Sequence, residues 1–292
     1  MGNDLVDCLV TGATGYLGKH VLANLERKHL SYVATSRGDC DLTDKRAVRT
    51  LLRRTKPSVI IHCAAMVPRS ASAYEDRRAA EASVAMVTTL AQHAVCPIVC
   101  VSSMTVYAEV ANFPVREDDA VFPKAGYARG KWLAEQALFQ RNGIGDVALR
   151  LPGLFGLPRR SGLLYNAAKS FLTTTRFEPA PLPSIWAAMA VQDAAEYVVR
   201  ATLSASSGCP PQPVNIGYEG EFSVPAAVAE IAAQCGLVWE SPQERVRPFS
   251  MCLDRLKQRY SLLSVTFLQR LKEFIDVVRH DLQAERTDAS HA

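Results

Sequence analysis

A strand-like segment near the start of the chain passes directly into a helix through a loop with three glycines. The apolar residues 5–10 precede the sequence TGATGYLG at positions 11–18, and an amphipathic stretch follows. In such a turn Gly12 takes a tight conformation, Gly15 lets the backbone approach a phosphate group, and Gly18 lets the helix pack on the strand. The free N–H groups and positive dipole at a helix start favour an anion. This order of strand, loop and helix predicts an α/β fold whose first turn binds a dinucleotide.

Composition limits the class of protein. The chain has 292 residues, 48% of them hydrophobic, and a formal net charge of +4, which suits one large domain with a smaller lobe. The mixed charges form no dense basic stripe, so nucleic acid is not an expected partner. The chain has no apolar run long enough to span a membrane and no cationic leader before an apolar segment. We therefore expect no membrane span and no signal peptide. The eight cysteines lack metal-ligand spacing, so we expect free thiols in the cytoplasm and no metal site.

Strand-like and helix-like segments alternate along the first half of the chain. Strands are predicted at 7–10, 32–36, 59–62, 98–102 and 147–151, and helices at 16–27, 45–54, 75–94 and 128–141. The third and fourth strands are apolar on consecutive residues, as expected where both faces of a sheet are covered. The alternation predicts a Rossmann-type, doubly wound parallel sheet with helices on both faces.

After residue 150 the pattern loosens into loops rich in proline and glycine around one helix predicted at 162–172. A helix at 191–203 and a strand at 213–218 are expected to return to the sheet. Helices at 224–235 and 263–282 are expected to close the chain, and the polar tail from residue 283 to be disordered. We therefore assign residues 1–155 to a dinucleotide-binding domain, with 188–218 returning to it, and residues 156–187 and 219–292 to a smaller substrate-binding lobe.

The candidate chemistry lies after the fourth strand. Ser102 and Ser103 end that strand, and Tyr127 and Lys131 share one face of the next helix because they are four residues apart. A phenol with its ordinary pKa of about 10 is a poor proton donor and acceptor near neutrality, but an adjacent ammonium favours its phenolate. A tyrosine and lysine at this spacing are more often an ordinary exposed pair. Following a glycine-rich turn and a strand-end serine pair, they predict a catalytic group.

With these motifs, the chain resembles the extended short-chain dehydrogenase/reductases that act on nucleotide sugars. The shared motifs are the Gly12/Gly15/Gly18 turn, Asp41-Leu42, His62-Cys63-Ala64-Ala65, Ser102-Ser103 with Val106-Tyr107, Tyr127 with Lys131, the run from Arg150 to Gly156, and Asn215-Ile216-Gly217. The short path from residue 36 to 44 is most similar to the dTDP-4-dehydrorhamnose reductase and GDP-fucose synthase branches. The resemblance implies a catalytic triad of Ser103, Tyr127 and Lys131.

The residues expected to hold the cofactor follow from the turn and from the resemblance. They are Gly12, Thr14, Gly15, Tyr16, Leu17, Gly18, Arg37, Asp41, Leu42, Ala64, Ala65, Tyr127 and Lys131. The resemblance implies that Asp41 and Leu42 border the adenine, and that Ala64 and Ala65 line the cofactor groove. Arg37 stands where an acidic residue would accept the ribose 2′-hydroxyl of NAD, so its guanidinium favours the 2′-phosphate of NADP. A solvent-facing Arg37 paired with Asp39 is the alternative, which leaves NAD open.

The chain departs from the family pattern in three respects. Ser83 stands where relatives commonly carry asparagine, and Gly153 where many sugar-nucleotide enzymes have asparagine. Met104 and Thr105 follow Ser103, where the dehydratase branch places Asp and Glu. Without that acid and base, dehydration is disfavoured.

Two other features remain open from the sequence. Arg159 and Arg160 suit either a diphosphate or a solvated pair. His62, at the end of a buried strand, is expected to be a hydrogen-bonded core imidazole rather than a proton shuttle.

The predicted function is NAD(P)-dependent reduction of a keto group on a sugar nucleotide of the 4-keto-6-deoxyhexose type, with NADP preferred. Tyr127 delivers the proton, Ser103 orients the carbonyl, and Lys131 holds the ribose. The alternatives are an NAD-dependent sugar-nucleotide epimerase and a non-catalytic NADP(H)-binding regulatory protein. The expected partner is a nucleotide-diphosphate sugar, and the resemblance also implies a homodimer through the helices at 75–94 and 128–141.

Overall fold

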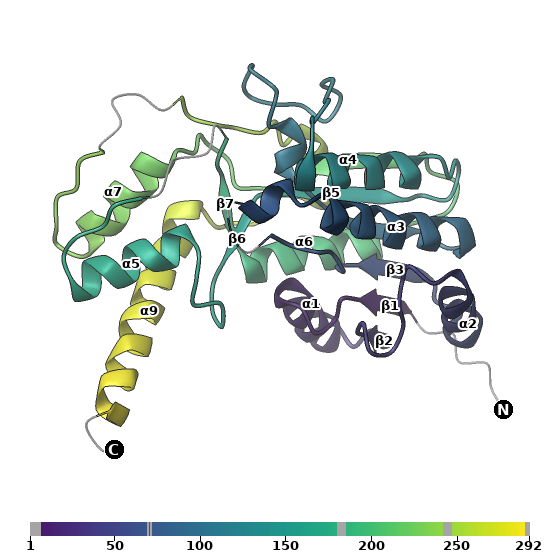
Figure 1. The fold of residues 1–292 in the computed structure, drawn as a ribbon, viewed down its shortest axis with the longest axis horizontal. Coiled ribbons are helices and arrows are strands. Elements are labelled where there is room, and N and C mark those ends of the chain that lie inside the picture. The colour runs from purple at the N-terminus through teal and green to yellow at the C-terminus, as the bar shows by residue number, and fades with distance from the viewer. Residues whose placement is uncertain (1–6, 69, 71, 180–184, 242–246, 290–292) are drawn as a thin grey trace.

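The computed structural model describes residues 7–289, apart from residues 69, 71, 180–184 and 242–246. Its centre is a six-stranded parallel sheet with the order β2-β1-β3-β4-β5-β8 (Figure 1). The strands are β1 (Cys8–Thr11), β2 (Tyr32–Thr35), β3 (Val59–His62), β4 (Ile98–Ser103), β5 (Val147–Leu151) and β8 (Gln212–Asn215). The chain winds outward from β1 in both directions, which confirms the predicted doubly wound, Rossmann-type sheet.

Helices cover both faces of the sheet. One face carries α2 (Lys45–Thr55), α3 (Arg77–His93) and α4 (Gly126–Phe139), and the other carries α1 (Tyr16–Arg27) and α6 (Val191–Leu203). In β3, Ile60 packs into the core under α2, α3 and α4, while Ile61 packs into the core shared with α1 and α6. Because successive side chains point to opposite faces, both must be apolar. This explains the consecutive apolar residues in the sequence.

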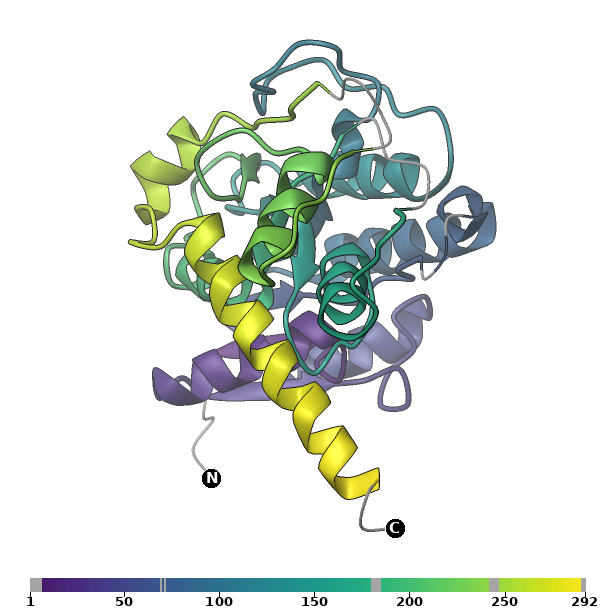
Figure 2. The same ribbon diagram turned by 90° about the vertical axis from the view of Figure 1, so that its left-hand side faces the viewer.

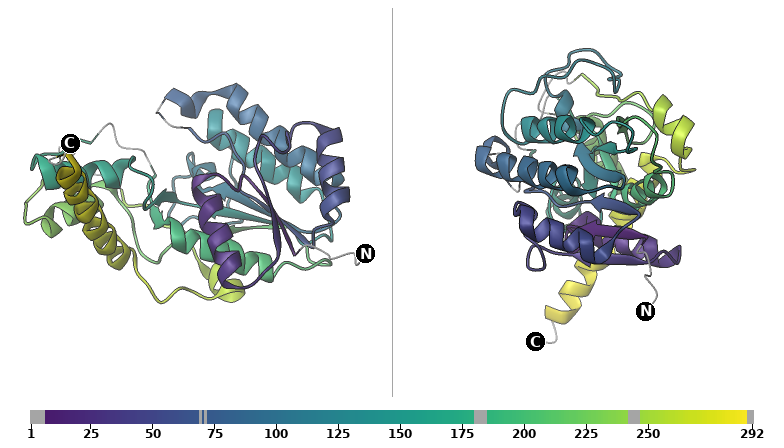
Figure 3. Two further views of the ribbon diagram at one scale, coloured as in Figure 1. Left: turned by 90° about the horizontal axis from the view of Figure 1, so that it is seen from below. Right: turned by 90° about the vertical axis from the view of Figure 1, so that its right-hand side faces the viewer.

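A second group of helices lies to one side of the sheet (Figure 2; Figure 3, left). α5 (Leu163–Thr173), α7 (Val224–Gln234) and α9 (Phe267–Ala289) share their own apolar core, next to the short parallel strands β6 (Gly153–Phe155) and β7 (Ala188–Ala190). The helix α8 (Asp254–Tyr260) instead contributes Leu256 and Tyr260 to the core of the main sheet. No helix among the residues described is both long and apolar enough to cross a membrane.

Several element limits differ from the sequence-based expectation. β6, β7 and α8 were not predicted, because elements this short carry too little periodicity. β8 ends at Asn215 rather than at residue 218. The prediction that the chain is disordered from residue 283 is wrong for residues 283–289, because α9 continues to Ala289. That stretch contains Gln, Ala, Glu and Arg, which are good helix formers; residues 290–292 lie outside the described chain.

The glycine-rich turn is packed tightly against its surroundings. Gly12 has a φ of +69°, and a Cβ there would lie 2.5 Å from the backbone nitrogen of Ala64. A Cβ on Gly18 would lie 2.2 Å from the carbonyl oxygen of Gly12. Gly15 is different, because a Cβ there would meet, among the described residues other than its chain neighbours, just the Gly12 carbonyl oxygen within 4 Å, at 3.1 Å. The fold therefore requires the first and third glycines, and the second leaves open space beside the backbone.

We predict that Gly18→Ala lowers the free energy of unfolding by about 1–3 kcal/mol, because the added carbon collides with backbone. In an ordinary helix the same change would be stabilising, by roughly 0.5–1 kcal/mol. Gly38→Ala is the matched control, since its Cβ would meet only the Ser36 hydroxyl oxygen, at 3.7 Å. Urea denaturation compares the two variants. Equal stability would contradict the tight packing described for this turn.

Candidate active site

The three predicted catalytic residues lie at the carboxyl edge of the sheet. Ser103 is the last residue of β4, Tyr127 lies in the first turn of α4, and Lys131 lies one turn further along that helix. α4 packs against both β4 and the short 3-10 turn that follows it, Met104–Tyr107. Ser103 and Lys131 are buried, and Tyr127 is half-buried. The fold thus brings a strand end and a helix start to one place.

The start of α4 is fixed by close contact with a preceding turn, Ser72–Glu75. Gly126 has a φ of +58°, and a Cβ on it would lie 1.9 Å from the carbonyl oxygen of Tyr74. The ring of Tyr74 packs edge-on against the ring of Tyr127, with centroids 5.7 Å apart and an interplanar angle of 82°. Tyr74 therefore supports the candidate proton donor, a role that sequence reasoning missed because the contact spans some fifty residues.

Lys131 is held with its ammonium close to Tyr127. Its Nζ donates to the carbonyl oxygen of Val101 at 2.7 Å and lies 5.6 Å from the centre of the Tyr127 ring. The described residues place no carboxylate within ion-pair distance of this ammonium. Its positive charge is thus available to a phenolate or to a ligand hydroxyl.

The hydroxyl of Ser103 has no hydrogen-bond acceptor among the described residues. Its Oγ accepts from the backbone nitrogen of Thr105 at 3.2 Å and from the Thr105 hydroxyl at 3.0 Å. Both contacts use the oxygen as an acceptor, so the hydroxyl hydrogen can be donated to another group. The two bonds hold the side chain at the end of β4.

The residues predicted near the adenine lie beyond the second strand. Asp41 accepts from the backbone nitrogen and hydroxyl of Thr43, at 2.9 and 2.7 Å, and these bonds lower its pKa. Asp39 accepts from the backbone nitrogen and hydroxyl of Ser36, at 2.8 and 2.6 Å, and forms no ion pair with Arg37. The exposed Arg37 is therefore not engaged by the carboxylate that the sequence offered as its alternative partner.

Two further residues are structural. His62 is buried, with its Nδ1 2.8 Å from the Thr11 hydroxyl, and burial lowers its pKa to about 3 with a further contribution from the charge of Lys131. It is a neutral core imidazole, as the sequence predicted. Ser83 accepts from the backbone nitrogen of Met66 at 3.1 Å and donates to the carbonyl oxygen of Ala79 at 3.0 Å. It therefore anchors the loop after β3 to α3.

A buried ion pair connects α4 to the sheet beneath the site. Arg150 on β5 donates from Nη2 and Nε to the carboxylate of Glu135 on α4, with the shortest contact at 2.7 Å. The two side chains are 4% and 1% exposed, and Ser102 donates to the same carboxylate. Sequence reasoning missed this pair, although a charged residue inside the apolar strand VALRL was a signal.

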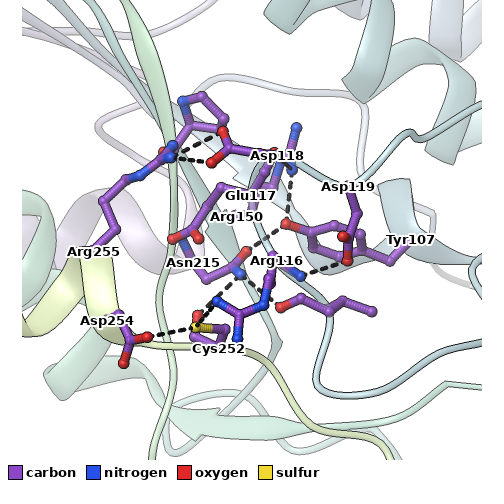
Figure 4. Close-up of polar contacts among 12 residues, drawn as sticks. Tyr107, Arg116, Glu117, Asp118, Asp119, Arg150, Asn215, Cys252, Asp254 and Arg255 are labelled. Carbon is purple, nitrogen blue, oxygen red and sulfur yellow. Dashed lines mark hydrogen bonds and ion pairs between the residues drawn. The ribbon is translucent and has the colours of Figure 1, made fainter.

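The pair continues into a polar network, shown in Figure 4. Arg150 Nη1 donates to the Tyr107 hydroxyl at 2.7 Å, and that hydroxyl donates to Asn215 Oδ1 at 2.7 Å. The backbone nitrogen of Asn215 donates to Glu117 Oε1 at 3.0 Å. The ends of β4, β5 and β8 are thereby joined to α4.

Removing one member of this pair leaves a buried charge without a partner. We therefore predict that Glu135→Gln lowers the free energy of unfolding by about 3–5 kcal/mol. The double variant Arg150→Met with Glu135→Leu should recover most of this loss, because neither charge is then buried. Lys124→Gln, which breaks the exposed ion pair with Glu109, is the control and should cost at most about 1 kcal/mol in urea denaturation. A Glu135→Gln protein as stable as the control would show that the pair contributes little.

The sequence has relatives among curated proteins. A protein named probable dTDP-4,6-dihydroxy-2-methyloxan-3-one 4-ketoreductase, from Streptomyces antibioticus, is 29% identical over 162 residues, which cover 52% of this chain and 53% of the relative. Methionine adenosyltransferase 2 subunit beta from Danio rerio is 32% identical over 157 residues, which cover 51% and 48% of the two chains. The chain thus spans about half the length of the curated relatives it matches.

The fold also matches solved structures. A dTDP-4-dehydrorhamnose reductase from Clostridium acetobutylicum superposes with a TM-score of 0.73 at 22% identity, covering 94% of this chain and 99% of that one. The family model described as the RmlD substrate binding domain matches residues 6–174, which is more than half of the chain. This span includes the glycine-rich turn, the strand-end serines and the start of α4. The chain therefore belongs to the RmlD substrate-binding domain family, a group of the extended short-chain dehydrogenase/reductase type that its motifs resemble.

Proposed function

We propose that this protein reduces a keto group on a sugar nucleotide of the 4-keto-6-deoxyhexose type with NADPH. The observation that carries the proposal is the placement of Ser103, Tyr127 and Lys131 at one edge of the sheet. The similarity to a protein named as a dTDP-sugar 4-ketoreductase supports the substrate class.

The glycine-rich turn fits a dinucleotide. Gly15 is exposed, and a side chain there would occupy the space beside the backbone at the start of α1. The N–H groups at that helix start suit a pyrophosphate, and Arg37 suits a 2′-phosphate. When bound, NADPH would supply the hydride that the carbonyl carbon receives.

The side chains of the site supply the proton and hold the carbonyl. Tyr127 gives its hydroxyl proton to the carbonyl oxygen, which becomes the product hydroxyl, and the phenolate that remains is stabilised by the ammonium of Lys131. Ser103 donates its free O–H to the same oxygen and so orients the carbonyl. Protonation from solvent, by way of the half-exposed Tyr127, restores the starting state.

The reaction is tested by NADPH oxidation with dTDP-4-keto-6-deoxyglucose as the probe, alongside the cofactor content of the purified protein. Consumption of NADPH by a protein purified without bound cofactor supports a reductase. Tightly retained NAD and interconversion of sugar-nucleotide epimers without net oxidation would replace the proposal with the epimerase.

We predict that Tyr127→Phe lowers turnover by about 10²–10⁴-fold, because the ring stays and only the proton donor is lost. NADPH affinity should be nearly unchanged. Tyr74→Phe is the control, since it removes the hydroxyl of the supporting ring and leaves the edge-on contact in place. If Tyr127→Phe keeps more than a tenth of the turnover, Tyr127 is not the proton donor.

Cofactor choice is predicted to depend on Arg37. For Arg37→Ala we expect the Kd for NADPH to rise by about 10- to 100-fold, with little change for NADH, because only NADPH carries the 2′-phosphate. Arg49→Ala removes an equal charge from the exposed face of α2 and serves as the control. Equal losses of affinity for both cofactors would reject the phosphate-binding role and favour NAD.

A second candidate is a non-catalytic NADP(H)-binding subunit of a larger assembly. The similarity to a protein named as a subunit, methionine adenosyltransferase 2 subunit beta, favours the membership of an assembly. In that case NADPH would bind normally, but no keto sugar nucleotide would be reduced, and Tyr127→Phe would change nothing measurable.

A further inference from the structure

Two consecutive arginines follow β6, and the structure gives them different partners. Arg160 forms ion pairs with two carboxylates on α9, Asp281 at 2.5 Å and Glu285 at 3.0 Å. Arg159 donates from Nε to the Ser161 hydroxyl at 3.3 Å, and no carboxylate of the described residues lies within ion-pair distance of it. The charge of Arg160 is therefore compensated, whereas no carboxylate of the described residues compensates the charge of Arg159.

The backbone that carries Arg159 is fastened to the glycine-rich turn. Tyr16, the first residue of α1, donates its hydroxyl to the carbonyl oxygen of Gly156 at 2.6 Å. The same carbonyl oxygen accepts from the backbone nitrogen of Arg159 at 3.2 Å, and the guanidinium carbon lies 5.8 Å from the centre of the Tyr16 ring. These contacts hold the guanidinium beside the start of α1, where Gly15 exposes its backbone.

The charge of Arg159 also affects Tyr74, which packs against the candidate proton donor. Burial raises the pKa of Tyr74, and the positive charge of Arg159 opposes that rise, which places the guanidinium within electrostatic reach of this phenol. The ring of Tyr74 in turn packs against Tyr127. This guanidinium, which has no carboxylate partner among the described residues, thus lies beside the Tyr16 ring at the start of α1 and close enough to Tyr74 to affect its pKa.

We propose that Arg159 binds a diphosphate. Its guanidinium would contact the ligand together with the N–H groups at the start of α1. The inference rests on the proposed function, which brings two such groups to this place, the pyrophosphate of the cofactor and the diphosphate of the sugar nucleotide. A planar guanidinium binds phosphate oxygens through paired, charge-assisted hydrogen bonds. Its contact with the Tyr16 ring keeps it in position before the ligand arrives. Arg160 has no such role, since α9 already engages it.

The test uses the full chain and calorimetric titration of two probes. The first is NADPH, and the second is dTDP or UDP added to protein saturated with NADP⁺. For Arg159→Ala we expect the Kd of at least one probe to rise by about 10- to 100-fold, because charge-assisted bonds are lost. Arg160→Ala is the matched control and should leave both dissociation constants within about twofold. Arg159→Lys keeps the charge without the planar fork and should fall between wild type and alanine.

The two arms identify which diphosphate is held. A loss confined to NADPH assigns Arg159 to the cofactor, and a loss confined to the nucleoside diphosphate assigns it to the substrate. Unchanged affinity for both probes in a folded Arg159→Ala protein, or equal losses in Arg160→Ala, would overturn the inference while leaving the proposed function in place. If the wild-type protein binds neither probe, the proposed function and this inference fail together.

Discussion

The buried pair of Arg150 and Glu135 is the interaction on which the arrangement of the site depends. Removing two charges from water is expensive, and an interior pair is tolerated only when its remaining polar atoms also find partners. Here Ser102 and Tyr107 supply them. The result is a set of directional bonds between the middle of α4 and two strands of the sheet. Apolar packing alone would allow α4 to slide or rotate. Lys131 and Tyr127, which lie one and two turns before Glu135, would then move with it.

Glycines allow α4 to lie close to its neighbours, and the ion pair between Arg150 and Glu135 then holds the helix in that position. Gly126 lets α4 begin against the backbone of Tyr74, and Gly130 lets the same helix approach α3, since a Cβ there would lie 2.9 Å from the Cβ of Ala80. In this chain Ala80 already serves the packing of α3 on α4. Its partner is a neighbouring helix of the same fold.

The sheet, its flanking helices and the glycine-rich turn could be predicted because their signals are local or periodic. The consecutive apolar residues of β3 and β4 indicated a sheet covered on both faces, and the order of motifs placed Ser103 and Lys131 at its carboxyl edge. The contacts between distant segments could not be predicted. Nothing near Tyr74 in the sequence indicates that its ring supports Tyr127, and two adjacent arginines look equivalent until α9 is seen to engage only Arg160. Local patterns specify elements, and the partners of a polar side chain follow from how the elements pack.

The proposed function can likewise be divided between two parts of the chain. Residues 6–174, which match the family, contain the turn, the strand end and the helix start on which the proposed function rests. The lobe of α5, α7 and α9 packs around a separate apolar core, and most of it lies beyond the matched span. In the proposed function, the reaction type therefore rests on the part of the chain that contains the buried pair of Arg150 and Glu135. We infer that, in the proposed function, the choice of sugar and base rests on the lobe, because its surface can change without disturbing the ion pair that holds α4. Arg159 lies between the main sheet and the lobe. Its turn is hydrogen-bonded to Tyr16 of α1, and the next residue, Arg160, forms ion pairs with α9. A diphosphate bound by Arg159 would therefore contact a residue that links the sheet to the lobe.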